Sequence, residues 1–156
     1  MAVMRLVDAA ATDALGAMVA RALIGHDGGL VVSLVGELGA GKTALARATL
    51  RGLGHQGAVV SPSYTLVEPY PIGGRTFHHL DLYRLGDPEE LEFLGVRDID
   101  TAHDWLFVEW AERGAGFLPP VDMVIELTYA KTGRDAQIRP LTGLGARFFE
   151  GLKNTT

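Results

Sequence analysis

A short glycine-rich segment in the first third of the chain has the residue types and spacing that bind phosphate. The segment GELGAGKT, residues 36–43, fits the pattern G-x-x-x-x-G-K-[ST] at every fixed position. Its glycines allow a tight turn and a close approach to an anion, toward which successive backbone N–H groups can point. The lysine adds a compact positive charge for the β- and γ-phosphates, and the threonine adds a hydroxyl for Mg²⁺. The motif therefore predicts a phosphate-binding loop formed by Gly36, Glu37, Leu38, Gly39, Ala40, Gly41, Lys42 and Thr43.

The sequence on either side of this loop supports the prediction. Leu30–Val35 is a continuous apolar, β-branched run, typical of a strand buried on both faces of a parallel sheet. Thr43–Leu53 reads as a helix that ends near Gly52 and Gly54. A loop between a buried strand and a helix is the setting that phosphate binding needs. This context disfavours the alternative, an ordinary glycine-rich turn with a solvated lysine.

Two acidic residues that end strand-like runs could complete an Mg²⁺ site. Glu109 follows the uniformly apolar run Trp105–Val108, which suits a parallel strand beside the loop strand. Asp81 follows Phe77–Leu80, a run that alternates and suits a hairpin. We therefore favour Glu109 as the acid linked to Mg²⁺, and Asp81 as a second acid that holds the metal indirectly or positions the attacking water. Either acid could instead be structural, since strand ends and turns also favour acids.

The sequence favours ATP as the nucleotide. Guanine recognition uses an N-K-x-D element, and Asn154 in the tail is the only asparagine of the chain, so that element cannot form. No segment has a clear sequence pattern for recognition of adenine. Thr12 and Arg134 could approach the base or ribose from flanking segments.

The segment between the loop helix and the next strand has the composition of a switch. Ser61, Ser63, Tyr64 and Thr65 flank Pro62 there, and their hydroxyls could sense the γ-phosphate. The alternative is a turn that contains proline and is capped by serine.

The remaining polar and aromatic candidates are weaker. His78 and His79 are adjacent, so on a strand they face opposite sides, and we interpret them as structural. Trp110, next to Glu109, is either a core residue or part of a contact surface.

The other elements complete an α/β pattern. We expect a helix from an N-cap at Thr12 to about Leu23, and a hairpin of Leu66–Tyr70 with Arg75–Leu80. Further elements are a short helix that begins near residue 87, a strand at 123–127, a weak edge strand at 136–139, and a short helix or loose tail from residue 143. Together they predict one domain over residues 1–156, with a three-layer, P-loop NTPase-like fold and a mixed central sheet.

Composition limits the remaining classes. The chain has 156 residues, a net charge of -5, no cysteine and no Lys/Arg cluster, which excludes disulfides and disfavours strong direct binding of nucleic acid. Asp8 and Asp13 interrupt the N-terminal apolar residues, so we do not expect this segment to be a signal peptide. The run Leu30–Val35 is far shorter than the roughly 20 residues of a membrane span. We expect a cytoplasmic protein, away from membranes, that is monomeric on its own.

Four ordered motifs resemble the TsaE (YjeE) family. They are GELGAGKT, SPSYTLVEPY, HHLDLYRL and FVEWAER, and the resemblance extends from the first helix to about Arg139. It implies a P-loop ATPase required for threonylcarbamoyladenosine in tRNA, one that acts on a TsaD–TsaB complex and meets tRNA only through these partners.

Carried to this chain, the resemblance implies a site for ATP and Mg²⁺. Thr43 and Glu109 would hold the metal, Ser61–Thr65 would form the switch, and Asp81 and Trp110 would be functional. Lys42, Asp81 and Glu109 are then the candidate catalytic residues. There are two departures from the family pattern. Ser63 replaces a common Thr but keeps a hydroxyl, and Ala44 replaces a common second hydroxyl, which removes one phosphate contact.

Two other functions remain open at this point. A small-molecule P-loop kinase would need an Arg-rich lid, and Arg75, Arg84 and Arg97 are scattered. A non-hydrolysing module, in which ATP only gates assembly, would use the same loop.

Overall fold

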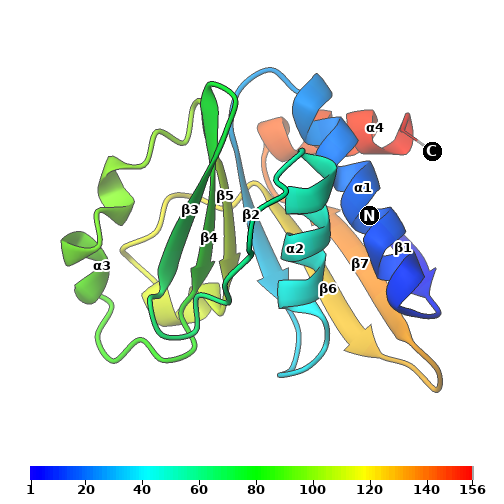
Figure 1. Ribbon diagram of the computed structural model, residues 1–156, viewed down its shortest axis with the longest axis horizontal. Helices are drawn as coiled ribbons and strands as arrows, with labels where there is room; N and C mark the ends of the chain where they lie inside the picture. The colour runs from blue at the N-terminus through cyan, green and yellow to red at the C-terminus, as the bar shows by residue number, and fades with distance from the viewer. Residues whose placement is uncertain (156) are drawn as a thin grey trace.

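The centre of the structure is a seven-stranded mixed sheet with strand order β1-β7-β6-β2-β5-β4-β3 (Figure 1). The computed structural model describes residues 1–155, so the last residue of the predicted domain lies outside it. The strands are β1 (Ala2–Leu6), β2 (Leu30–Val35), β3 (Val67–Ile72), β4 (Arg75–Asp81), β5 (Trp105–Glu109), β6 (Met123–Tyr129) and β7 (Arg134–Pro140). The helices are α1 (Ala9–Gly25), α2 (Lys42–Gly52), α3 (Glu90–Phe93) and α4 (Gly143–Lys153), with 3₁₀ turns η1 (Val96–Asp98) and η2 (Ala111–Gly114).

Four parallel strands form the middle of the sheet. β2 pairs in parallel with β5 on one side and β6 on the other, and β4 continues in parallel beyond β5. The outer strands β3, β7 and β1 pair in the antiparallel sense. Because the parallel strands share a direction, the segments that follow β2, β4, β5 and β6 all leave the sheet at the same edge. Ligands of open α/β sheets bind at this edge.

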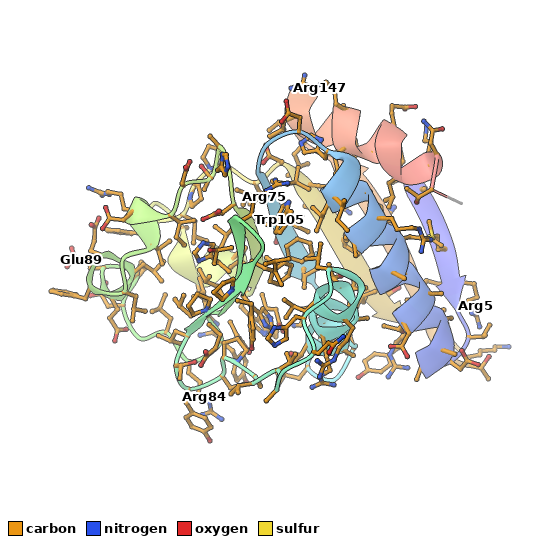
Figure 2. All side chains as sticks on the ribbon, turned by 45° about the horizontal axis from the view of Figure 1, so that its top comes forward. Arg5, Arg75, Arg84, Glu89, Trp105 and Arg147 are labelled. Carbon is orange, nitrogen blue, oxygen red and sulfur yellow. The ribbon has the colours of Figure 1, made fainter. Side chains whose placement is uncertain are left out.

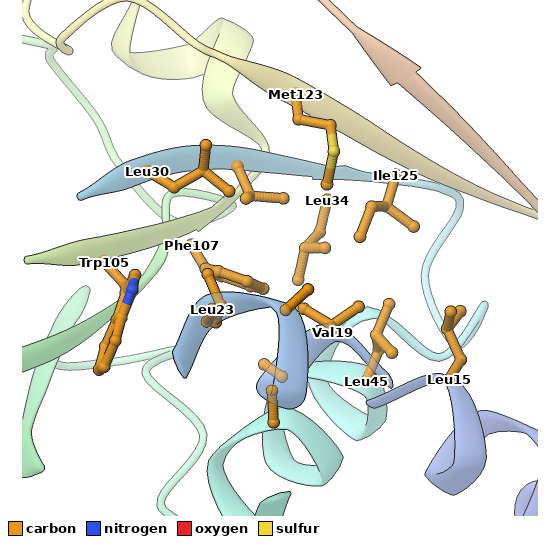
Figure 3. Close-up of a cluster of buried hydrophobic side chains, with 14 of the residues drawn as sticks. Leu15, Val19, Leu23, Leu30, Leu34, Leu45, Trp105, Phe107, Met123 and Ile125 are labelled. Carbon is orange, nitrogen blue, oxygen red and sulfur yellow. The ribbon is translucent and has the colours of Figure 1, made fainter. Parts of the chain in front are cut away.

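One face of the sheet is covered by α1, α2 and α4. Figure 3 shows Leu15, Val19 and Leu23 of α1 packed against Leu34 of β2 and Phe107 of β5. The helices α1 and α2 approach closely through small residues. A Cβ at Gly16 would lie 2.3 Å from the Cβ of Ala48. This contact fixes α2, the helix that follows the glycine-rich loop, against α1.

The other face is covered by short elements. Val31, Leu80, Leu106 and Val108 pack there against residues of α3, η1 and the connecting loops. The predicted α/β fold with a mixed sheet is therefore confirmed, and its second outer layer is thin. Among residues 1–155, no helix is long and apolar enough to cross a membrane.

Most predicted elements are present. β2 has the predicted bounds, α2 begins one residue early, and the hairpin β3–β4 turns at Gly73 and Gly74. The prolines Pro69 and Pro71 lie on the edge strand β3, where a missing N–H is tolerated.

Two predictions at the ends of helices were wrong. The N-cap of α1 is Asp8, whose carboxylate accepts the N–H of Ala11 at 2.9 Å, while the N–H of Thr12 is already bonded to the carbonyl of Asp8. The helix therefore starts one turn earlier than predicted. The acidic turn after residue 87 is helical for four residues only, from Glu90, so its predicted start was also too early.

Near the C-terminus, the structure corrects the prediction of an edge strand and decides between the two alternatives for the last segment. β7 is an inner strand, with Ala136 and Ile138 buried, because the unpredicted strand β1 pairs outside it and forms the edge. The segment from Gly143 is an ordered helix, anchored by Phe148 in the core.

His26, just after α1, is a half-buried histidine in an unfavourable setting for charge. Its Nε2 has no hydrogen-bond partner among the described residues, and its ring meets Phe148 edge-on at 5.7 Å. Burial lowers the pKa of His26, and the positive charges of Arg75 and Arg147, labelled in Figure 2, lower it further; Asp27 and the backbone of Gly29 oppose them weakly.

This lowered pKa predicts a pH-dependent stability. Between the folded pKa of His26 and about 6.5, the unfolded chain binds more protons than the folded one, so stability rises with pH in this window. We expect the melting temperature of the wild type to fall as pH drops below 6.5, and to fall less in His26→Phe. The exposed His103 provides the control His103→Phe, which should follow the wild type. Equal slopes for wild type and His26→Phe in thermal unfolding between pH 5 and pH 7.5 would contradict the prediction.

Candidate functional site

The glycine-rich loop joins β2 to α2 at the carboxyl edge of the sheet, and its backbone needs glycine at two positions. Gly41 has a φ of 109°, in the left-handed region. A Cβ at Gly36 would lie 2.7 Å from the carbonyl oxygen of Leu127 in β6. The predicted tight turn agrees with this geometry, and Gly36 makes its close approach to β6, while approach of these glycines to an anion stays a prediction.

The loop is held from outside by the hairpin β6–β7. Arg134 donates from Nε to the carbonyl of Ala40 at 3.2 Å and from Nη2 to the carbonyl of Gly39 at 3.3 Å. The hydroxyl of Tyr129 donates to the carbonyl of Leu38 at 3.0 Å, and the Arg134 guanidinium lies over the Tyr129 ring. Within one planar trans peptide, C=O and N–H point in opposite directions. The N–H groups of Gly39 and Gly41 therefore point away from the hairpin.

Lys42 is the buried cation of the site. It is 5% exposed, its Nζ donates to the carbonyl of Gly36, and Nζ lies 3.8 Å from the centroid of the Trp110 ring. Burial lowers the pKa of Lys42, against the nearby carboxylates, which raise it. Trp110 itself has a φ of 59°, which is rare for a bulky residue. Such a conformation persists where surrounding contacts hold it, and here those contacts include the candidate catalytic lysine.

Glu109 lies directly beside the loop. In the parallel register of β2 and β5 it is opposite Leu34, two residues before the loop begins. Its carboxylate is 2% exposed and accepts the Thr43 hydroxyl at 3.0 Å through Oε2 and at 3.3 Å through Oε1. The structure thus brings together the two residues that the sequence assigns to Mg²⁺.

Asp81 is opposite Glu109 in the parallel pair of β4 and β5. One of its oxygens accepts the N–H of Tyr83 at 3.0 Å, and the other lies 3.5 Å from the Ser63 hydroxyl, which bonds to Ser61 at 2.8 Å. Asp81 therefore caps a turn and also contacts the predicted switch. Both interpretations of Asp81 fit this geometry.

The rest of the predicted switch faces outward. Tyr64 is 82% exposed and lies under the guanidinium of Arg84, which Figure 2 labels. The side chain of Thr65 is also exposed. Ser63 is thus the switch residue that contacts a candidate catalytic group in this structure.

A cavity of about 940 Å³ opens next to the loop. It extends from Gly39–Gly41 past Ala44 and Arg47 of α2 to the start of α1, and Thr12 and Arg134 both line it. Its volume is within the range of small-molecule sites. Both residues predicted to approach a base or ribose therefore lie where such a group would fit.

The oxygen atoms of Thr43 and Glu109 at the loop suit Mg²⁺ as ligands. Within residues 1–155, no group of three His, Asp or Glu side chains could enclose a metal ion. Mg²⁺ does not require one, because it is commonly held by one or two carboxylates together with phosphate oxygens and water. A hydroxyl and a carboxylate side by side, at the end of a phosphate-binding loop, match this pattern.

Sequence reasoning missed one contact of this site. His78 and His79 do face opposite sides of the sheet, as predicted, with His78 bonded to Asp104 at 3.1 Å. His79, however, bonds to Glu109 at 2.6 Å. Only the pairing of β4 with β5 would have indicated this contact, because His79 and Glu109 are 30 positions apart in the sequence.

Comparison with known proteins decides the family. The sequence profile described as "Threonylcarbamoyl adenosine biosynthesis protein TsaE" matches residues 6–137. The chain belongs to the TsaE family. Its role therefore lies in the biosynthesis of threonylcarbamoyladenosine in tRNA.

Individual TsaE proteins agree over most of the chain. The protein of Haemophilus influenzae named "tRNA threonylcarbamoyladenosine biosynthesis protein TsaE" is 46% identical over 80% of this chain and 79% of its own length. The protein of the same name from Streptomyces coelicolor is 36% identical over 86% of this chain and 91% of its own. The crystal structure of YdiB from Bacillus subtilis superposes with a TM-score of 0.81 at 26% identity, covering 98% of this chain and 94% of that one.

The hairpin contacts predict that Arg134 orders the loop. Replacing Arg134 by Met removes two hydrogen bonds, each worth about 1 kcal/mol, and leaves two carbonyls of the loop without these donors. If the loop must then be ordered on binding, ADP affinity should fall by roughly five-fold or more.

The control is an arginine that binds the same hairpin without touching the loop. Arg5 donates to the carbonyl of Thr132 at 2.8 Å, so Arg5→Met should keep ADP affinity within a factor of about two of the wild type. Calorimetric titration with ADP measures both variants. Equal ADP affinity for Arg134→Met and Arg5→Met would show that the clamp does not order the loop.

Proposed function

We propose that this TsaE-family protein binds ATP·Mg²⁺ and hydrolyses the ATP in support of threonylcarbamoyl modification of tRNA. The observation that carries the proposal is the meeting of the loop Gly36–Thr43 with Glu109. The hydroxyl of Thr43 lies 3.0 Å from the carboxylate of Glu109 at the carboxyl edge of the sheet. The loop supplies N–H groups and Lys42 for phosphates, and the pair of oxygen groups supplies ligands for the metal.

The cavities suggest how ATP would lie. With the phosphates on the loop, the adenosine would extend into the 940 Å³ cavity between α1, α2 and the hairpin, near Thr12 and Arg134. The γ-phosphate would lie on the side of Lys42, toward a second cavity of about 540 Å³ that Trp110 and Glu112 line. Ala44 lines the first cavity without a hydroxyl, which leaves the phosphate contact there to the backbone.

Each residue of the site then has a role in hydrolysis. Lys42 leaves the Gly36 carbonyl to bind the β- and γ-phosphates, while Thr43 and Glu109 hold the metal. Mg²⁺ held by these two residues would neutralise part of the charge of the phosphates. Asp81 would accept a hydrogen bond from the attacking water or help to hold the metal indirectly, and Ser63 links Asp81 to the switch. Trp110, in contact with Lys42, would sense whether that lysine is bound to phosphate.

The family role extends the proposal to partners. We propose that a TsaD–TsaB complex completes the active site and raises the rate of hydrolysis, and that tRNA is met only through this complex. The acidic balance of the chain, with a net charge of -5, agrees with indirect contact with tRNA. Such a protein would work in the cytoplasm, where tRNA is modified.

The arginines give little support to a small-molecule kinase. Arg75 donates to the backbone at Gly28 and His103, and Arg97 pairs with Glu92. These two arginines therefore contact other parts of the fold and do not form a lid over the phosphate-binding loop. An ATP-gated assembly module remains the second candidate, because it would use the same binding residues without turnover.

The proposal predicts the result of a hydrolysis assay. Wild-type protein should release phosphate slowly alone and faster with a TsaD–TsaB complex. Glu109→Gln should lose at least about 100-fold in rate, because the metal loses an anionic ligand. Glu89→Gln is the matched control, since it removes an exposed acid that lines neither cavity and does not contact Thr43, and it should keep most of the rate.

Two other outcomes would change the assignment. ATP binding without turnover, even with partners, would favour the gating module. Transfer of labelled γ-phosphate to a metabolite would favour the kinase.

A further inference from the structure

The contact between His79 and Glu109 is a short polar contact in the buried part of the site. The imidazole is 0% exposed, and its Nε2 lies 2.6 Å from Oε2 of Glu109. The other ring nitrogen, Nδ1, is buried and has no hydrogen-bond partner among the described residues. Neither the phosphate motif nor the family match gives this histidine a function.

The missing partner of Nδ1 fixes the direction of the hydrogen bond. A hydrogen on Nδ1 would be a buried donor without an acceptor, which costs about 1–3 kcal/mol. A hydrogen on Nε2 finds the carboxylate at 2.6 Å instead. His79 is therefore the donor, in the tautomer that carries hydrogen on Nε2, and the Glu109 carboxylate accepts.

This hydrogen bond makes the two oxygens of Glu109 unequal. Oε2 accepts from His79 at 2.6 Å and from Thr43 at 3.0 Å, whereas Oε1 has only the longer Thr43 contact of 3.3 Å. The imidazole thus fixes the rotation of the carboxylate and leaves the lone pairs of Oε1 available beside the Thr43 hydroxyl. A metal-bound water or the metal itself would be held there.

The surroundings of His79 make it a rigid support. It is opposite Phe107 in the parallel pair of β4 and β5, and Phe107 packs on Phe77 at 4.7 Å. β4 lies between β5 and β3 and is paired on both sides, so the backbone that carries the imidazole cannot shift easily. Groups behind a metal ligand that fix its orientation typically contribute 10- to 100-fold in metal affinity or activity.

We propose that His79 is a positioning residue that orients the Glu109 carboxylate for Mg²⁺ through its Nε2–H. The inference rests on the proposed function, because it assumes that Glu109 serves a metal bound with nucleotide. It differs from a packing role in one respect: the effect depends on a hydrogen-bond donor at the place of Nε2, and filling the same volume is not sufficient.

Three substitutions separate a donor from a space filler. His79→Leu fills similar space without a donor. His79→Gln restores a donor N–H near the place of Nε2. His79→Asn keeps a polar amide, but its N–H falls near the place of Nδ1 and cannot reach Glu109. His78→Leu, on the opposite face of the same strand, is the control for the loss of a partly buried histidine.

The measurement is the affinity for ADP by calorimetry, with Mg²⁺ and with EDTA. The ratio of the two affinities reports how well the site holds the metal and needs no catalytic turnover. We expect His79→Leu and His79→Asn to lose about ten-fold of the Mg²⁺ enhancement while their metal-free ADP affinity stays at the wild-type value. His79→Gln should recover most of the enhancement, and His78→Leu should keep all of it.

Each contrary result has a distinct meaning. Full Mg²⁺ enhancement in His79→Leu or His79→Asn would overturn the positioning role. So would a loss of metal-free ADP affinity as large as the loss with Mg²⁺, or a failure of His79→Gln to differ from His79→Asn, because both would indicate packing. If His79→Leu does not fold, the comparison of Gln with Asn decides alone. If the ADP affinity of the wild type is the same with Mg²⁺ and with EDTA, the result would instead refute the proposed function.

Discussion

The parallel pairing of β2 with β5 is the constraint on which the rest of the site depends. It places Glu109 opposite Leu34 and therefore within reach of the first hydroxyl of α2. Pairing of β4 with β5 then sets Asp81 beside Glu109, and pairing of β6 with β2 brings Leu127 against the loop backbone. A shift of one residue in the register of any of these pairings would turn the side chains of the shifted strand to the opposite face of the sheet.

The site keeps several groups in costly positions, and the fold compensates for each. Burial of a charge costs several kcal/mol unless it is paired and hydrogen-bonded. The Glu109 carboxylate receives two donors, each worth about 1.5–3 kcal/mol to a charged group, so its burial is largely offset. Lys42 has weaker compensation, a carbonyl and an aromatic face, which agrees with its lowered pKa. A lysine held this loosely can leave these partners for a phosphate without losing a strong ion pair.

Local sequence was sufficient for the loop and for the four parallel strands. The five apolar residues at 30–35 and the glycine and lysine spacing at 36–43 are compatible with few other structures, and both segments lie where they were predicted. The preference for Glu109 over Asp81 as the residue beside the loop also followed from local pattern, since a uniformly apolar strand belongs in the middle of a sheet. The functional roles of these residues stay predictions.

What the sequence could not supply was pairing between distant segments. β1 carries a weak alternating pattern and becomes a strand by pairing with β7, which made β7 an inner strand. The clamp of Arg134 on the loop and the bond from His79 to Glu109 join residues that are 94 and 30 positions apart. The early start of α1 was missed for another reason. Asp8 and Thr12 are both good caps, and the short link from β1 selected the first.

The most direct test of the account is a crystal structure of the protein with a non-hydrolysable ATP analogue and Mg²⁺. We predict that the β-phosphate lies within hydrogen-bond distance of the loop N–H groups and of Lys42, and that the metal contacts the Thr43 hydroxyl with Glu109 beside it. The adenosine should fill the cavity lined by Thr12 and Arg134. Phosphates bound away from residues 36–43, or a metal remote from both Thr43 and Glu109, would contradict the account.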